Sequence, residues 1–270
     1  MIPVPRSIAR IPILRGLYRI ALNGYARLSR GRYMVEQRMG LRLLLDLDNV
    51  VDQQVFVSGT WEKGTIDTLL GLAQEERQRH GGEAVFVDIG AHWGLYALLA
   101  HQSGMFDRIV AFEPDPTNYG QLQANLFLNG ATTAIEALQL ATSDRERTFG
   151  LSLATSRNRG GTRVVDVAQG DQVTCRAIRV DQQLDLAGKL LVIKMDVEGH
   201  EMEAIDGLLG LLAKNHCVLQ IEIWSTPEEE MPRRLALLET LFARYGIKFV
   251  SAIITDHFFV SQPRAQHSQT

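Results

Sequence analysis

The feature that most constrains the fold is an alternation of strand-like and helix-like segments that begins at residue 84. Short apolar runs with the pattern of buried strands occupy residues 84–89, 108–112, 134–140, 190–196, 217–223 and 247–254. Segments with helical periodicity separate them, at residues 93–102, 116–129, 199–213 and 228–245. This alternation is typical of an α/β protein with a mostly parallel, doubly wound sheet. Such sheets bind ligands at the carboxyl ends of their strands, so a site is expected there.

Composition agrees with one large α/β domain. The chain has 270 residues, of which 46% are hydrophobic and 22% charged, which is enough for a sizeable core. Its net charge of −3 gives no general attraction for nucleic acid, and no nucleic-acid partner is predicted. Cys175 and Cys217 form no CxxC pair, which argues against a disulfide framework or a cysteine zinc site and favours the cytoplasm.

The two ends of the chain differ from its centre. We predict a basic N-terminal helical extension at residues 1–40, a catalytic-type domain at 41–262 and a disordered tail at 263–270. The extension contains no apolar stretch long enough for a signal core or a membrane span. A helix over residues 11–28 would suit peripheral contact with an anionic membrane at its inner face; packing on the domain or a frayed arm are the alternatives.

One interval interrupts the alternation. Residues 144–180 are polar and contain glycine, as in "SLATSRNRGGTRVVDVAQGDQVTC". This composition predicts a loop or hairpin insertion. Its position predicts that it covers a substrate.

The first strand of the alternation ends in a motif, "VFVDIGAHWGLYALLA", which places Asp88, Gly90 and Gly94 at a strand-to-helix turn. The GxGxxG spacing that brings backbone against a pyrophosphate is missing, which argues against a nicotinamide dinucleotide. An acid followed by a turn of small residues suits S-adenosylmethionine, whose sulfonium is positive. Glu113, in "VAFEPDP" at the end of the next strand, is placed to accept hydrogen bonds from ribose hydroxyls.

Five segments together resemble the FkbM family of S-adenosylmethionine-dependent methyltransferases. They are "VFVDIGAHWGLYALLA", "IVAFEPDPTNYGQLQANLFLNG", "LQLATSD", "LLVIKMDVEGHEMEAIDGL" and "VLQIEIW". The resemblance implies the class I, Rossmann-like methyltransferase fold: a seven-stranded, mostly parallel sheet with an antiparallel final strand and helices on both faces. It also implies O-methylation of a hydroxyl on a sugar, a glycan or a glycosylated natural product.

The resemblance also implies which residues contact the cofactor. These are Glu62 (from "SGTWEKGTID"), Asp88, Gly90, Ala91, Gly94, Glu113, Pro114, Thr142 and Asp196. The family usually has asparagine where this chain has His92, and we assign His92 to the same cofactor loop. Contact with substrate, or a hydrogen bond at the helix start, are the alternatives for this side chain.

The segment "IKMDVEGHE" bears on the methyl acceptor. It lacks the Asn/Asp-Pro-Pro-aromatic stretch that binds a flipped base, so base methylation is disfavoured. A hydroxyl needs a general base, and we predict Glu222, Glu198 and His200 as the catalytic candidates. Their structural alternatives are helix capping for Glu198 and a solvated first turn for His200.

Two further alternatives stay open from the sequence. Clustered carboxylates can bind Mg²⁺, which would then orient neighbouring sugar oxygens, although no ligand set is assigned. The second is a different class of protein: a cofactor-binding or membrane-associated assembly protein without catalysis. Acids gathered at the open end of the sheet favour the enzyme over this non-catalytic interpretation.

Overall fold

The computed structural model describes residues 32–152, 159–166, 173–223 and 230–262, together with positions 21 and 24. Most of the predicted basic helix at 11–28, and the predicted tail at 263–270, lie outside these residues. Within the described part, no helix combines the length and the apolar character needed to cross a membrane.

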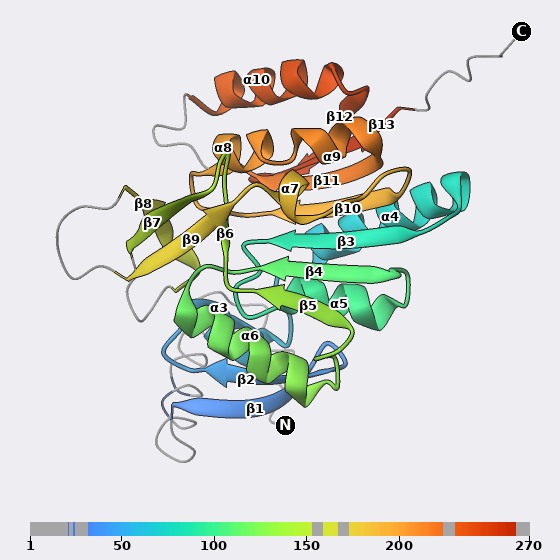
Figure 1. The fold of residues 1–270 in the computed structure, drawn as a ribbon. Coiled ribbons are helices and arrows are strands. Elements are labelled where there is room, and N and C mark those ends of the chain that lie inside the picture. Colours follow the sequence, from blue (N-terminus) through green and yellow to red (C-terminus); the bar gives the residue numbers. More distant parts are fainter. Residues whose placement is uncertain are drawn as a thin grey trace, which may run out of the picture.

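The elements follow one another along the chain as drawn in Figure 1. They are β1 (Tyr33–Arg38), β2 (Leu41–Asp46), α3 (Val50–Ser58), α4 (Lys63–His80), β3 (Ala84–Ile89), α5 (Leu95–Ser103), β4 (Arg108–Phe112), α6 (Pro116–Leu128), β5 (Ile135–Leu138), β6 (Ala141–Thr142), β7 (Arg147–Ser152), the 3₁₀ turn Arg159–Gly161, β8 (Arg163–Val165), β9 (Thr174–Ile178), α7 (Val180–Gln183), β10 (Leu190–Met195), α8 (Glu201–Asp206), α9 (Leu209–Lys214), β11 (His216–Glu222), α10 (Met231–Ala243), β12 (Ile247–Ile253) and β13 (Asp256–Ser261).

A seven-stranded sheet forms the centre of the described structure, in the order β12-β13-β11-β10-β3-β4-β5 (Figure 1). The strands from β11 to β5 pair in parallel, whereas β13 runs antiparallel to both β11 and β12. The mostly parallel sheet and its antiparallel final strand, expected from the sequence, are therefore confirmed. The periodicity alone had predicted six strands, because β13 follows β12 after a short turn.

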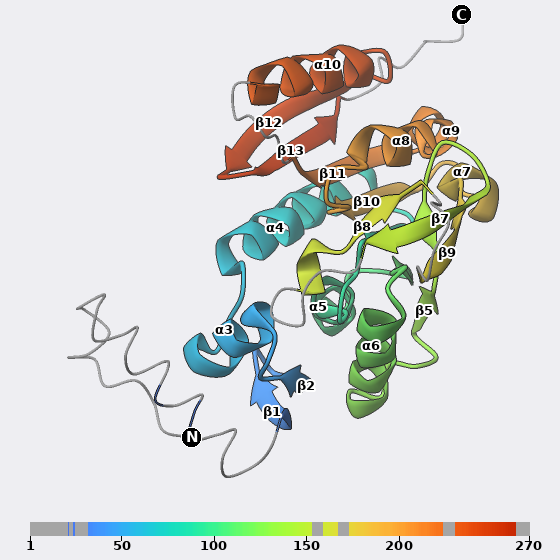
Figure 2. The same cartoon turned by 90° about the vertical axis from the view of Figure 1, so that its left-hand side faces the viewer.

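Helices pack against the two faces of this sheet. Ala84 and Phe86 of β3 enter a core cluster with side chains of α4, α5 and α6, whereas Val85 and Val87 enter a second cluster with α7 to α10. Figure 2 shows α4 on one side of the sheet and α8 and α9 on the other. Because both faces are covered, every residue of β3 is buried, which explains its continuous apolar sequence.

A second, smaller sheet forms from the predicted insertion and the strand before it, in the order β6-β9-β7-β8. β7 pairs antiparallel with β8 and with β9. The hairpin interpretation of residues 144–180 is thus correct for the described part of that interval. This sheet lies beside the carboxyl ends of the central strands (Figure 2).

The N-terminal hairpin was not anticipated. β1 pairs with β2 over its whole length, so the predicted boundary at residue 41 falls between two strands of one hairpin. Leu43 and Leu45 of β2 are fully buried in the cluster that contains α6. The Asn125 side chain fixes this packing, accepting from Leu44 N (2.7 Å) and donating to Trp93 O (2.9 Å).

The helix predicted at residues 199–213 is divided into α8 and α9. The break falls at Gly207, where a Cβ would lie 2.1 Å from the carbonyl oxygen of Ser143. A continuous helix with a side chain there would collide with the backbone beside β6. Close packing against that backbone accounts for the difference from the prediction.

Candidate active site

A cavity of about 390 Å³ opens at the carboxyl ends of β3, β4, β10 and β11. Its lining includes Glu62, Gly90, Ala91, His92, Glu113, Pro114, Thr142, Asp196, Glu198, His200 and Glu222. These are all of the predicted site residues except Asp88 and Gly94. Segments that are far apart in the sequence therefore meet where a parallel sheet is expected to bind its ligand.

The glycines of the turn after β3 serve close packing within the protein. Gly90 has φ 75°, and a Cβ there would lie 1.8 Å from the carbonyl oxygen of Asp196. Gly94 has φ 88°, and its Cβ would lie 2.3 Å from a methyl group of Leu122. Gly94 is not among the residues that line the cavity, and its lack of a side chain allows α5 and α6 to pack closely here.

Asp88, predicted to contact the cofactor, is also absent from the cavity lining. Its side chain is 1% exposed and accepts a hydrogen bond from Ala97 N at 3.1 Å, at the start of α5. Burial raises the pKa of Asp88 to about 6, and the nearby Lys194 opposes this rise. Asp88 therefore orients α5 and faces a buried cation.

Lys194 is that cation. Its Nζ donates to Gly90 O at 2.8 Å and lies 3.8 Å from Asp88 Oδ1 and 3.7 Å from Asp196 Oδ2. Burial lowers the pKa of Lys194, but Asp196 and Asp88 raise it by more, so that it lies above its usual value. The lysine is held in the charged form and joins the β3–α5 turn to the β10–α8 turn.

Glu113 directly follows β4 and lines the cavity. Its two oxygens accept from His92 N (2.7 Å) and Asp115 N (2.9 Å). Burial raises the pKa of Glu113 to about 8, against the effect of these two N–H groups. The rest of "EPDP" has a structural role, because Asp115 caps α6 by accepting from Thr117 N at 2.7 Å.

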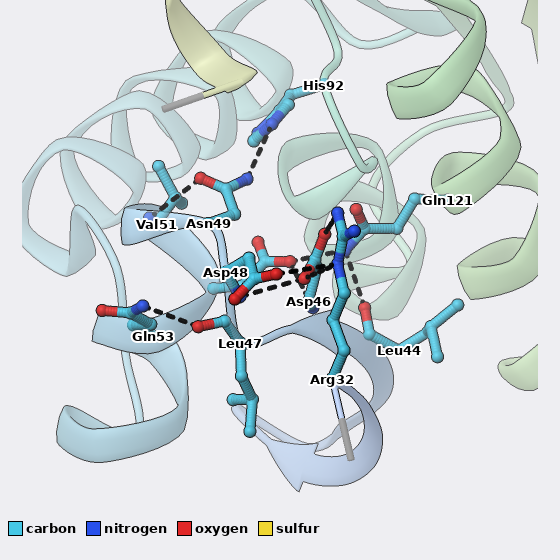
Figure 3. A network of polar contacts seen from close by, with 11 residues as sticks. Arg32, Leu44, Asp46, Leu47, Asp48, Asn49, Val51, Gln53, His92 and Gln121 are labelled. Carbon is cyan, nitrogen blue, oxygen red and sulfur yellow. Dashed lines mark hydrogen bonds and ion pairs between the residues drawn. The ribbon is translucent and has the colours of Figure 1, made fainter. Parts of the chain in front are cut away.

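The His92 side chain turns toward the N-terminal part of the chain. Its Nε2 lies 3.4 Å from Asn49 Nδ2, as Figure 3 shows, and Asn49 is the N-cap of α3. In the same region, Asp52 Oδ2 accepts from Asp46 N (2.6 Å) and from Gln121 Nε2 (2.8 Å). The hairpin, α3 and α6 thus form one buried network that positions His92 at the cavity.

A second network forms the wall opposite the small sheet. Tyr96 Oη donates to Glu62 Oε2 at 2.8 Å, and Gln220 Nε2 donates to Tyr96 Oη at 3.1 Å. Gln220 also donates to Asp256 Oδ1 of β13 at 2.8 Å. Burial raises the pKa of Glu62, which the Tyr96 hydrogen bond opposes. The predicted cofactor residue Glu62 is therefore held at the lining by a helix and two strands.

The three predicted catalytic residues occupy different environments. Burial raises the pKa of Glu198 to about 7, and the charge of Asp196 adds to that rise. Glu222 Oε1 accepts from Thr255 Oγ1 at 3.0 Å. Burial lowers the pKa of His200, whose Nε2 lies 3.1 Å from Ser143 Oγ. A pKa of about 7 suits Glu198 to accept a proton near neutrality.

Backbone strain also gathers at this cavity. Glu62, His92 and Glu198 line it and have φ values of 43°, 52° and 51°. Such left-handed backbone is rare outside glycine and is common at functional sites. All three had been selected from the sequence.

Several buried polar atoms at the cavity have no hydrogen-bond partner in the described structure. They are Thr142 Oγ1, Asp196 Oδ1 and Trp93 Nε1. Buried polar groups are normally paired, so these atoms are suited to a polar ligand.

The small sheet supplies one wall of the cavity through Gly160, Thr162 and Val164. Thr162 Oγ1 donates to Asp115 Oδ2 at 3.0 Å, which ties this sheet to the start of α6. The sequence had placed the insertion near substrate without identifying these residues.

Tyr96 and Lys194 are the main lining residues that sequence reasoning did not assign. Tyr96 lies in the helical segment predicted at residues 93–102, whose periodicity does not mark it as a site residue. The available signal was Lys194 itself, a lysine inside an otherwise apolar strand buried on both faces, which requires acidic partners.

The acids of the cavity do not form a set of ligands for Mg²⁺. Among the described residues, one group of three His, Cys or acidic ligand atoms lies within 4.8 Å of one another, and it consists of Glu76, His80 and His216. The Mg²⁺ site considered from the sequence therefore has no support from the placement of Asp196, Glu198 and Glu222.

Comparison with known proteins finds several methyltransferases to which the chain is similar. The chain is 28% identical to methyltransferase sdnD of Sordaria araneosa over 57% of this chain and 71% of that protein. It is 26% identical to the hexuronic acid methyltransferase AglP of Haloferax volcanii, over 62% of this chain and 65% of that protein. Among solved structures, the putative transferase PH0793 from Pyrococcus horikoshii aligns with a TM-score of 0.46 and 14% identity, covering 93% of this chain and 84% of that one.

The sequence profile of the methyltransferase FkbM domain matches residues 88–249. That interval runs from the acid that ends β3 to the middle of β12 and contains most of the cavity lining. The family resemblance stated from the sequence is confirmed: this chain belongs to the FkbM methyltransferase domain family.

Proposed function

We propose that the protein is an S-adenosylmethionine-dependent O-methyltransferase with the class I fold, acting on a hydroxyl of a sugar, a glycan or a glycosylated natural product. The observation that carries the proposal is one cavity in which Glu113 and the unpartnered Thr142 and Asp196 atoms face the predicted base, Glu198. A binding region and a proton acceptor are both needed for methyl transfer to a hydroxyl.

The lining divides into regions with distinct tasks. Glu113, held by two backbone N–H groups, is placed to accept hydrogen bonds from ribose hydroxyls, and Thr142 borders the adenine region. Asp196 and Glu62 give the remaining surface an acidic character that suits a sulfonium and an ammonium. When bound, S-adenosylmethionine supplies the electrophilic methyl group.

Glu198 is proposed as the base that accepts the hydroxyl proton. A carboxylate with a pKa of about 7 is half ionised near neutrality and is more basic than an ordinary glutamate. Glu222 shares the cavity but accepts a hydrogen bond from Thr255, and we assign it the orientation of the acceptor.

The acceptor is proposed to be an acidic sugar. Arg163 of the small sheet has its Nη2 atom 3.8 Å from Glu198 Oε2. Its side chain is 62% exposed, so the guanidinium is available to a carboxylate entering the cavity. The name of the relative AglP, a hexuronic acid methyltransferase, supports this choice. A guanidinium pairs with a carboxylate through two parallel hydrogen bonds.

The test uses tritiated S-adenosylmethionine with uronic-acid glycosides and with matched neutral glycosides. Label transferred to the uronic acid, and lost in Glu198→Gln but kept in the exposed control Glu136→Gln, would support the proposal. If calorimetry shows that the cofactor binds, but label reaches neither class of glycoside nor a fractionated cell extract, the result would favour the non-catalytic alternative. Equal transfer to both glycosides would overturn the acidic-sugar assignment alone.

A further inference from the structure

A second cluster of ligand-type side chains lies at the opposite end of the central sheet. It consists of Glu76 and His80, in the last turns of α4, and His216, the first residue of β11. Glu222, at the other end of β11, borders the active-site cavity. Six steps along a strand separate the two ends by roughly 20 Å, so this cluster is distinct from the cavity.

The sequence already contains a signal for this cluster. The buried face of α4 follows Ile66, Leu69 and Ala73, and the next residue of that face is Glu76. Its side chain is only 5% exposed, which is rare for a carboxylate without strong partners. His80 stands four residues later on the same face of the helix, where side chains meet.

The three side chains converge on one carboxylate oxygen. Glu76 Oε2 lies 2.7 Å from His216 Nε2 and 3.5 Å from His80 Nε2. The two imidazole rings lie with their centroids 3.5 Å apart. Arg79 binds the other oxygen, Oε1, and leaves Oε2 directed at the two histidines.

This donor set is one that transition metals prefer. Two imidazole nitrogens and one carboxylate oxygen make up a known class of zinc site, with a fourth position left for water. Donor atoms of a tetrahedral site lie roughly 3.3 Å apart for metal bonds of about 2.0–2.1 Å. The two separations from Glu76 Oε2, 2.7 and 3.5 Å, lie on either side of that value, and the three ligand atoms all lie within 4.8 Å of one another.

We propose that Glu76, His80 and His216 form a zinc-binding site that joins the end of α4 to the start of β11. The ligands come from two elements that already pack against each other through the core cluster containing Leu69 and Val218. A metal held there adds a link between helix and strand and takes no part in methyl transfer.

The experiment titrates Zn²⁺ into untagged, chelator-treated full-length protein and measures the dissociation constant by calorimetry and the melting temperature. Wild type is expected to bind one ion saturably and to melt at least a few degrees higher with zinc, because a ligand of the folded state stabilises it. Co²⁺ in place of zinc is expected to give the visible absorption of a tetrahedral site.

The principal variant is His80→Ala, because His80 is the most exposed ligand and its loss leaves the hydrogen bond between Glu76 and His216 in place. The substitution should weaken zinc binding by at least about tenfold and abolish the rise in melting temperature that zinc causes. His101→Ala, an exposed histidine of α5, is the matched control and should bind as wild type does.

Two outcomes would overturn the proposal: no saturable Zn²⁺ binding by the wild type, or equal affinities in wild type and His80→Ala. Glu76→Gln gives a second measurement in which the carboxylate is removed and the shape retained. If Glu76→Gln is folded by circular dichroism and still binds zinc with wild-type affinity, that result would also overturn the proposal.

Discussion

The charged and polar groups at the two ends of the central sheet differ in whether they have partners within the protein. At the amino end, Glu83 pairs with Lys189 at 2.5 Å, and the Asp107 carboxylate accepts from Ala84 N at 2.8 Å. At the carboxyl end, Asp196 Oδ1 and Thr142 Oγ1 are buried without a hydrogen-bond partner among the described residues. Three cavity-lining residues there also have left-handed backbone. The groups named at the amino end find their partners within the protein, whereas Asp196 Oδ1 and Thr142 Oγ1 at the carboxyl end are left for a ligand.

The largest contrast is expected between two lysines that lie at opposite ends of β10. Lys194→Met leaves the buried charge of Asp88 and the partly exposed charge of Asp196 without their cation, and should lower the free energy of unfolding by about 3–5 kcal/mol. Lys189→Met removes the partly exposed ion pair with Glu83 and should lower the free energy of unfolding by less than about 1 kcal/mol. Urea denaturation of both variants measures the difference, and similar losses would show that the two ends do not differ as described.

The next effect is catalytic. Glu198→Gln keeps the shape of the side chain but removes the base, so turnover should fall about 10²–10³-fold with cofactor affinity retained. Wild-type activity should rise with pH through about 7, because the carboxylate must lose its proton before it accepts another. That ascending limb should vanish in Glu198→Gln. If Glu222→Gln loses the limb instead, Glu222 is the base.

A smaller effect distinguishes packing from backbone conformation in the turn after β3. Gly90→Ala places a methyl group against Asp196 O at left-handed φ, and should destabilise the protein by about 2–4 kcal/mol. Gly104→Ala has a similar φ of 66° but open space around the new methyl, and should lose about 1 kcal/mol. Thermal unfolding compares them; equal losses would mean that the close approach contributes nothing.

The smallest effect concerns the cofactor. Glu113→Gln should weaken S-adenosylmethionine binding by about 1–3 kcal/mol, because one of the two carboxyl oxygens that hydrogen-bond the ribose hydroxyls is replaced. Glu136→Gln, on the exposed surface of β5, should bind normally. Calorimetry on both variants makes the comparison. Unchanged affinity in Glu113→Gln would remove Glu113 from the proposed ribose site.

The central sheet was largely predictable because its signals are local. The segments at residues 84–89 and 108–112 coincide with β3 and β4, and the helix expected at 116–129 with α6. The hairpin before residue 47 could not be predicted in the same way. Its strands are short, and it depends on Asn125, far along the chain, for the hydrogen bond to Leu44.

The sequence by itself determined the alternation of strands and helices in the central sheet, the turn after β3 and the identity of many of the polar residues that line the cavity. Those properties follow from periodicity and from residues that precede or follow a strand, which are local features. Tertiary structure decided that Asp88 lies behind the cavity, that Lys194 lies between two acids, and that Glu76 meets His216. Each of these contacts joins residues far apart in the chain, and only the packed sheet and its helices bring such residues together.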